Sequence, residues 1–222
     1  VSTQSTGNKM SQSYVTGTTA IGIKYNGGVL LAADSALSYG KMHLDRDYCR
    51  IQQLTNKAAL VFSGDEADMR DAMKVIQDEV SSARFDGLQV PSAKSIHGTL
   101  SLQNYSKRND GEPYVNGFLV AGSSFLGYID LFGTNFETDF FATSLGRYYC
   151  MPLLRRLWRQ DLTKDEAHNI IKECIKVMFN NDCLALQQYN CWFISEQGIE
   201  KVKGSSGDDF SIAAHSDMRQ FV

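Results

Sequence analysis

One short segment near the start of the chain predicts a tight β-hairpin. Residues 20–25 (AIGIKY) are typical of a strand, Asn26-Gly27-Gly28 supplies turn residues, and residues 29–33 (VLLAA) are typical of a returning strand. Thr18 lies just before the first strand, and Asp34 lies directly after the second. The hairpin therefore predicts that the hydroxyl of Thr18 faces the carboxylate of Asp34.

A threonine that faces an aspartate in this way is the arrangement of an N-terminal nucleophile. In that chemistry the hydroxyl attacks, and the residue's own α-amine, with a pKa of roughly 7.7–8.0, acts as the base. Seventeen residues precede Thr18 in this chain. Its nitrogen is in an amide bond and cannot take a proton, so the sequence as written has the hydroxyl without its base.

The remaining elements are predicted to alternate between strands and pairs of helices. Helical spacing of apolar residues, or a start signal, predicts helices near 69–83, 96–105, 147–160 and 163–178. Further strands are predicted at 58–62, 115–122, 125–132, 189–194 and 199–202. Ser63-Gly64-Asp65 is predicted to turn into the first helix, and residues 38–50 are a polar stretch without a predicted element. Thr163-Lys164-Asp165-Glu166 is a capping box that predicts the start of the last helix.

This order of elements predicts the fold class. Antiparallel sheets can pack face to face and leave their outer faces to pairs of helices. The sequence therefore predicts an α+β fold, a four-layer αββα sandwich. Its parts are expected to be an extended N-terminal arm at 1–16, one domain at 17–203, and a C-terminal tail at 204–222 that begins after a Gly/Ser break.

Composition excludes several classes of partner and site. A net charge of −3 gives no reason to expect nucleic acid or an anionic membrane as a partner. No apolar run approaches the roughly 18–20 residues that span a bilayer. The cysteines form no CxxC pair, and the histidines show no metal-ligand spacing, so we expect neither a metal nor another cofactor.

At this point the chain resembles a proteasome beta-type subunit, a family with the N-terminal nucleophile hydrolase fold. The resemblance covers about residues 17–203, and the spacing from Thr18 to Asp34 is the spacing of that family. Its most specific segments are Gly17-Thr18-Thr19, Asn26-Gly27-Gly28-Val29, Ala32-Ala33-Asp34-Ser35, Ser63-Gly64-Asp65 and Asn181-Asp182. Finer features resemble the non-catalytic member at the seventh position of the eukaryotic beta ring, namely Val15-Thr16-Gly17-Thr18, Ser38-Tyr39-Gly40, residues 125–130 and residues 142–146.

The resemblance also implies a site that has lost its chemistry. Thr18 occupies the position of the family's nucleophile, and Asp34 that of the aspartate that holds a lysine. The degenerate positions are Arg50 in place of the lysine, and Leu145 and Ala185 in place of two serines; Asp182 retains the family's second aspartate. Arginine is effectively never deprotonated, and neither Leu nor Ala can form a side-chain hydrogen bond. We therefore expect no catalytic residue in this chain.

The implied function is that of a non-catalytic structural subunit of the 20S core particle, in which sister subunits perform the threonine-type endopeptidase reaction of ubiquitin- and ATP-dependent degradation. Expected partners are beta subunits of the same and the opposite ring and the alpha ring, in cytoplasm and nucleus. The tail residues expected to contact the opposite ring are Phe210, Ile212, Met218, Phe221 and Val222. The alternatives are an active threonine endopeptidase in precursor form and a ring of identical peptidase copies.

Overall fold

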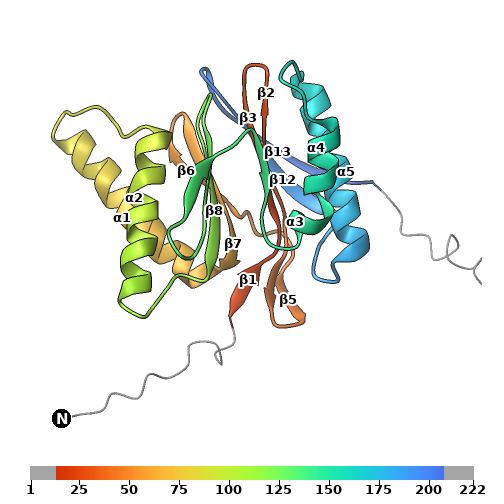
Figure 1. The fold of residues 1–222 in the computed structure, drawn as a ribbon, viewed down its shortest axis with the longest axis horizontal. Helices are drawn as coiled ribbons and strands as arrows, with labels where there is room; N and C mark the ends of the chain where they lie inside the picture. Colours follow the sequence, from red (N-terminus) through yellow and green to blue (C-terminus); the bar gives the residue numbers. More distant parts are fainter. Residues whose placement is uncertain (1–13, 208–222) are drawn as a thin grey trace, which may run out of the picture.

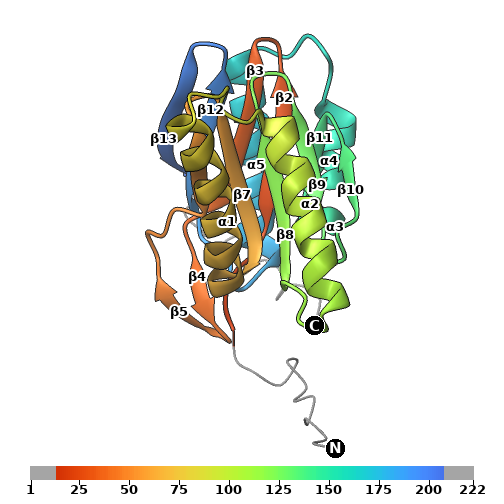
Figure 2. The ribbon, with the colours of Figure 1, turned by 90° about the vertical axis from the view of Figure 1, so that its left-hand side faces the viewer.

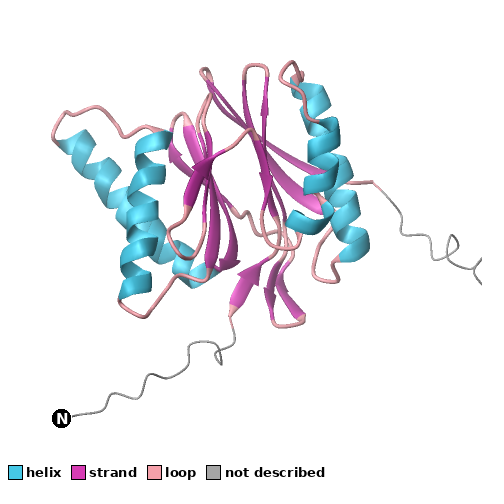
Figure 3. Cartoon of the chain, viewed as in Figure 1, coloured by secondary structure: helices cyan, strands magenta, loops and turns pink. Residues whose placement is uncertain are grey.

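Two antiparallel sheets lie face to face between two layers of helices (Figure 1; Figure 3 colours the same view by element type). This computed structural model describes residues 14–207. The helices are α1 (Glu66–Phe85) and α2 (Ala93–Asn109) on one side, and α3 (Gly146–Tyr149), α4 (Met151–Leu157) and α5 (Lys164–Asn181) on the other. The predicted four-layer αββα sandwich is confirmed. Among residues 14–207, no helix combines the length and the apolar character needed to cross a membrane.

The first sheet has the strand order β10-β9-β8-β7-β1-β4-β5, with β6 paired to β7. Its strands are β1 (Val15–Gly17), β4 (Leu37–Tyr39), β5 (Met42–Asp45), β6 (Ile51–Thr55), β7 (Ala58–Asp65), β8 (Asn116–Ala121), β9 (Leu126–Ile129) and β10 (Asn135–Glu137). The short strand β1 lies inside this sheet, because it pairs with β7 on one side and with β4 on the other.

The second sheet has the order β11-β2-β3-β12-β13 and contains the predicted hairpin. Its strands are β2 (Ala20–Tyr25), β3 (Gly28–Asp34), β11 (Phe140–Ala142), β12 (Gln188–Ser195) and β13 (Gly198–Ser205). The register joins Ala20 to Ala33 and Tyr25 to Gly28. Gly27 has a φ of 109°, a conformation that a residue with a β-carbon rarely adopts, so a glycine is required in this turn.

Strand β3 is buried on both faces, which explains its uninterrupted apolar sequence. Leu30 and Ala32 belong to a core cluster beneath α4 and α5, whereas Val29, Leu31 and Ala33 belong to the core between the two sheets. A strand with one solvated face would instead alternate apolar and polar residues. The hairpin is therefore central to the molecule, and its Asp34 end is held by packing from both sides.

The capping box predicted at residues 163–166 is present. The Thr163 hydroxyl accepts a hydrogen bond from the Glu166 amide at 3.3 Å, and the Glu166 carboxylate accepts one from the Thr163 amide at 2.9 Å. Helix α5 begins directly after this cap and buries the residues predicted for its inner face, which are Ala167, Ile170, Ile171, Cys174, Ile175 and Met178.

The single helix predicted at 147–160 was wrong. The chain instead forms α3 and α4, which meet at Cys150, and the helical segment ends before Trp158. A helix that began at 147 would need an amide hydrogen at position 152, beyond its first turn, and Pro152 has none. In the first turn of α4 the missing amide hydrogen costs nothing. Trp158 is extended and donates its indole N–H to the Lys24 carbonyl at 3.1 Å.

Three other segments differ from the prediction. The polar stretch 38–50 contains β4 and β5, because β1 provides an edge for β4. Residues 63–65 are not a turn but the end of β7, which pairs there with β1. The strand predicted at 125–132 ends at Ile129, since the Asp130 carboxylate accepts hydrogen bonds from the amides of Phe132 and Thr134 and forms a turn.

The ends of the domain extend slightly beyond the predicted boundaries. Strand β1 begins at Val15, inside the predicted arm, and β13 continues through Ser205, inside the predicted tail. The rest of the arm and most of the tail, including the five tail residues expected to contact the opposite ring, lie outside the described residues. The division into arm, domain and tail stays a prediction.

Candidate functional site around Thr18 and Arg50

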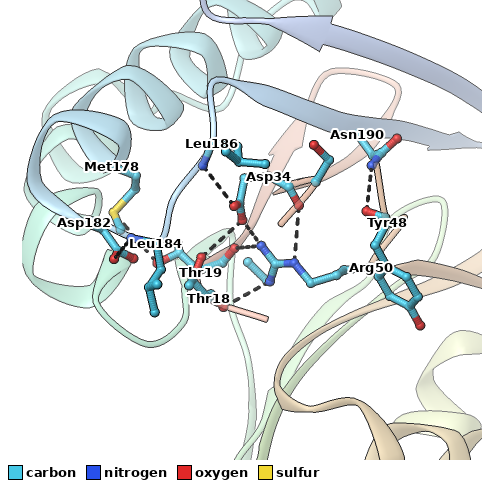
Figure 4. A network of polar contacts seen from close by, with 12 residues as sticks. Thr18, Thr19, Asp34, Tyr48, Arg50, Met178, Asp182, Leu184, Leu186 and Asn190 are labelled. Carbon is cyan, nitrogen blue, oxygen red and sulfur yellow. Dashed lines mark hydrogen bonds and ion pairs between the residues drawn. The ribbon is translucent and has the colours of Figure 1, made fainter. Parts of the chain in front are cut away.

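The candidate site lies at the end of the β2–β3 hairpin where Thr18 meets Asp34. The Thr18 hydroxyl donates a hydrogen bond to Asp34 Oδ1 at 3.2 Å (Figure 4). This is the contact that the hairpin predicts. It depends on β2 and β3 pairing in register up to Ala20 and Ala33, which places the residues flanking both strands at the same end of the second sheet.

Arg50 is fully buried beneath this pair and uses all three of its guanidinium nitrogens. Nη2 contacts the Asp34 carboxylate and donates to the Thr19 carbonyl at 2.8 Å. Nη1 donates to the carbonyls of Thr18 and Phe62 at 3.0 and 3.1 Å, and Nε donates to the Asp34 carbonyl at 3.3 Å. Arg50 thus forms an ion pair with Asp34 and also binds the carbonyls of Thr18 and of the residue that follows it.

Gly17 makes room for this arginine. A β-carbon built on Gly17 would lie 2.2 Å from Arg50 Cδ and 2.9 Å from its Nε, far inside contact distance. The segment that precedes Thr18 therefore passes directly over the arginine side chain. Any larger residue at position 17 would displace either the strand β1 or the guanidinium.

Asp34 is 3% exposed and connects three parts of the chain. Its Oδ1 atom receives the Thr18 hydroxyl and the Arg50 guanidinium, and its Oδ2 atom accepts the Leu186 amide at 3.2 Å. The loop that follows α5 is thereby joined to the start of β2. Both oxygens of the carboxylate are engaged in holding structure.

Leu145 and Ala185 add no polar group to the site. Leu145 is 42% exposed at the start of α3, and Ala185 is 6% exposed in the core cluster that contains α5. The loop at Leu145 is also unusual, because Ser144 has a φ of 50°, the left-handed region that favours glycine. The Gly146 amide, which follows this loop, donates to the Thr19 hydroxyl at 3.0 Å.

Thr19 is a site residue that the sequence analysis missed. It is 4% exposed, and its hydroxyl accepts from Gly146 while it faces the sulfur of Met178 at 3.8 Å. Successive residues of an extended chain point to opposite sides, so Thr19 points toward α3 and α5 whereas Thr18 points toward Asp34. That alternation was the one signal available in the sequence.

Asp182 does not contact Thr18 or Arg50. It ends α5, and its Oδ1 atom accepts the Leu184 amide at 3.0 Å within its own turn. Figure 4 shows it on the opposite side of Thr18 and Thr19 from Arg50. Its Oδ2 atom is buried and has no hydrogen-bond partner among residues 14–207.

The polar groups around Thr18 are hydrogen-bonded to one another and to the backbone. The one side chain that receives the Thr18 hydroxyl is Asp34, and that carboxylate is shared with Arg50 and with a backbone amide. Arginine donates hydrogen bonds but accepts none and keeps its proton. Within the described part of the chain, no group of three or more His, Cys, Asp or Glu side chains is placed to hold a metal ion.

Comparison with known proteins identifies the family. A family model described as "Proteasome subunit" matches residues 14–194, most of the described chain. The chain belongs to the proteasome subunit family. The resemblance inferred from the hairpin, the Ser63-Gly64-Asp65 segment and Asn181-Asp182 is thereby confirmed, and the two-sheet architecture is that of the N-terminal nucleophile hydrolase type.

Beta-type proteasome subunits are among the matching relatives. The chain is 34% identical to "Proteasome subunit beta type-4" of Xenopus laevis, over 90% of this chain and 86% of that protein. It is 28% identical to "Probable proteasome subunit beta type-7" of Schizosaccharomyces pombe, over 85% of this chain and 76% of that protein. It is 26% identical to "Proteasome subunit beta type-7" of Saccharomyces cerevisiae, over 83% and 75%. The protein is therefore a beta subunit of the proteasome core particle.

Proposed function

We propose that this proteasome beta subunit is a non-catalytic, structural member of the 20S core particle. The observation that carries the proposal is Arg50, whose guanidinium fills the space beneath Thr18 and spends its donors on Asp34 and four backbone carbonyls. A group in this position can neutralise the aspartate. It cannot accept a proton from the Thr18 hydroxyl or pass one on.

The other degenerate positions support the same proposal. Leu145 and Ala185 offer no hydrogen bond, and the Thr18 nitrogen is the amide that follows Gly17 in strand β1. Removal of one well-placed acid–base group typically lowers a rate by about 10²–10⁴-fold. Such effects are not additive within one catalytic unit, so the factors are not multiplied. Each substitution is nevertheless expected to lower the rate.

We also propose that the subunit occupies the seventh position of the beta ring. The names of the two yeast relatives, both called beta type-7, support this position, as does the resemblance of residues 38–40 and 125–130. Its partners would be neighbouring beta subunits, the alpha ring and the opposite beta ring, in the cytoplasm and nucleus. Its contribution to protein degradation would be assembly of the particle in which active sister subunits work.

The second candidate, an active threonine endopeptidase in precursor form, draws support from one contact. The Thr18 hydroxyl still donates to Asp34. The two candidates are separated by measuring peptidase activity and the N-terminus of this subunit in purified particles. If the subunit is structural, Thr18→Ala particles keep the wild-type rates against all peptide substrates, and a threonine-directed electrophile leaves the subunit unlabelled.

A matched control is the threonine-to-alanine variant of a sister subunit that the electrophile does label, which should lose one class of peptidase activity. Recovery of a chain that begins at Thr18 and carries the electrophile would overturn the structural proposal. Intact-mass measurement of the subunit from the same particles reports both results at once.

The proposed role of the tail needs its own experiment. Replacement of Phe210, Ile212, Met218, Phe221 and Val222 with serine should weaken the joining of half-particles, because a segment that orders on binding depends on its apolar contacts. The control replaces Ser211, His215 and Ser216 with alanine and leaves the five apolar side chains of the tail unchanged. Normal amounts of full particle from the serine variant would contradict the proposed inter-ring contact.

A further inference from the structure

A cavity of about 1060 Å³ opens at the end of the sandwich that is remote from Thr18. One end of β7 pairs with β1 next to Thr18, whereas Ala58, at the other end, lines the cavity. The wall is formed by the connection between α1 and α2 and by the turns after β6 and β8. In Figure 1 this connection arches away from the sheets, and Figure 2 views the layer of α1 and α2 from its outer side.

The chain around this cavity exposes large apolar side chains. Phe85, the last residue of α1, is 92% exposed, and Leu88, in the connection to α2, is 65% exposed. Val90 and Phe125 line the cavity itself. Most residues of the cavity wall are polar, so the exposed apolar side chains are those of Phe85 and Leu88, which neighbour the lining residues Arg84 and Gln89 in the chain. Single exposed apolar residues are ordinary, but grouped ones are a feature of interaction surfaces.

The acidic side chains that line the cavity are already paired. Glu196 contacts Lys57 Nζ at 2.9 Å and accepts a hydrogen bond from Ser123, and these partners lower its pKa. Glu137 contacts Lys24 Nζ at 3.2 Å. Neither carboxylate contacts the remaining cations of the cavity, which are Arg84 and Lys94.

Arg84 and Lys94 have no ion-pair or side-chain hydrogen-bond partner within residues 14–207. Arg84 lies in the last turn of α1, where a cation is favoured by the helix dipole. Lys94 lies in the first turn of α2, where a cation opposes the dipole, and that turn carries no acidic residue. Local helix stability therefore does not explain Lys94.

We propose that the surface formed by the cavity residues Arg84 and Lys94 and by Phe85 and Leu88, which lie in the chain between them, binds a segment of another subunit that presents carboxylates beside apolar side chains. The two cations outnumber the exposed carboxylate of Asp86, which lies between Phe85 and Leu88, and they complement an acidic segment rather than a basic one. The proposal rests on membership of a multi-subunit particle and is independent of whether Thr18 is catalytic.

The first test measures whether the surface is covered on assembly. In a Phe85→Cys variant, reaction of the new thiol with a maleimide is followed by peptide mass mapping, in the free full-length chain and in assembled particles. Because thiol reactivity follows access, we expect labelling in the particle to be slower by about tenfold or more. Equal labelling rates in the two states would overturn the proposal.

The second test addresses the acidic character of the partner. Reversal of both charges, Arg84→Glu with Lys94→Glu, should reduce incorporation of the subunit into particles by about tenfold at low salt, and by less as salt screens the attraction. The matched control, Arg84→Lys with Lys94→Arg, keeps both charges and should incorporate normally. Both residues are exposed, so the fold is expected to survive, which an unfolding curve of the free chain verifies. If the charge-reversed variant is incorporated normally, the partner is not acidic. This holds even if labelling of the Phe85→Cys thiol is slower in the particle.

Discussion

Arg50 and Asp34 form an ion pair whose two side chains are 0% and 4% exposed. The same guanidinium donates to the carbonyls of Thr18 and Thr19. One side chain therefore both neutralises a buried carboxylate and fixes the backbone at the start of β2. A lysine would provide one nitrogen in place of three, and could not reach these acceptors together. An arginine at position 50 thus makes backbone contacts that a lysine there would lack.

Arg50→Ala should lower the free energy of unfolding by about 3–5 kcal/mol, because it leaves the buried Asp34 carboxylate without its cation. Urea denaturation of the full-length chain measures the change. Arg70→Ala is the control: this residue pairs with Glu66 on the surface and its side chain is 76% exposed, so we expect a much smaller loss. Equal losses for the two variants would contradict a structural role for the Arg50 contacts.

Ser144→Gly should stabilise the protein. Ser144 has a φ of 50°, a region that costs a residue with a β-carbon roughly 1–2 kcal/mol. Glycine avoids this cost, but it is more flexible in the unfolded chain, and that flexibility cancels about half of the gain. We therefore expect a gain of about 0.5–1 kcal/mol in denaturation experiments. Ser144→Ala keeps the β-carbon and should show no gain. A gain of the same size in the alanine variant would point to the lost hydroxyl as the cause.

Thr163→Ala should lower the free energy of unfolding by about 1 kcal/mol, because it removes the hydroxyl half of the cap of α5. The other half depends on pH. Hydrogen bonds from the Thr163 amide and hydroxyl, with the nearby Arg159, lower the pKa of Glu166 below its usual 4.5. This contribution is present above the unfolded pKa and is lost as pH falls through the lower folded pKa.

Glu166→Gln should accordingly remove part of the acid sensitivity seen when unfolding is followed from pH 6 down to pH 3. Glu173→Gln, on the exposed side of the same helix, preserves the cap and serves as the comparison. If both variants lose stability with the same slope below pH 4.5, the cap contributes nothing through Glu166.

His97 should make the fold weaker in mild acid. Its ring nitrogen Nε2 lies 3.1 Å from the Tyr128 carbonyl, which can only accept, and burial lowers the pKa of the imidazole below 6.5. Since the unfolded chain takes up the proton first, stability is full above pH 6.5 and falls as pH drops from 6.5 toward the folded pKa. His97→Gln, which keeps a donor for the carbonyl, should flatten the pH dependence of the unfolding free energy between pH 7.5 and 5. An unchanged slope would rule out this histidine as its source.

Local signals predicted the parts of the fold that depend on neighbours in sequence. The β2–β3 hairpin follows from its turn residues and apolar strands, and α5 from the Thr163 cap. Strands β4, β10 and β11 could not be predicted, because each is three residues long and exists through pairing with a distant strand. The break at Cys150 was missed because the predicted helix placed Pro152 beyond its first turn; a helix beginning at Met151 is the start that a proline at 152 favours.

The sequence predicts which residues form the site better than it predicts their hydrogen bonds. Thr18 and Asp34 have the spacing that brings them together, and Arg50 supplies the positive charge that a buried carboxylate requires. The carbonyl oxygens that receive Arg50 are backbone groups, which a sequence does not distinguish from any other. The pairing of Thr19 with Gly146 depends on α3, whose position follows from packing across the second sheet.

Strand β1 gives the residues before Thr18 a place in the architecture. Among the described strands, β4 pairs with β1 and β5 alone, and β5 pairs with β4 alone. A chain shortened to begin at Thr18 would lack Val15–Gly17, and the β4–β5 hairpin would be severed from the ladder that ends at β7. Release of the threonine amine would therefore remove the strand that joins β4 to β7 in this sheet.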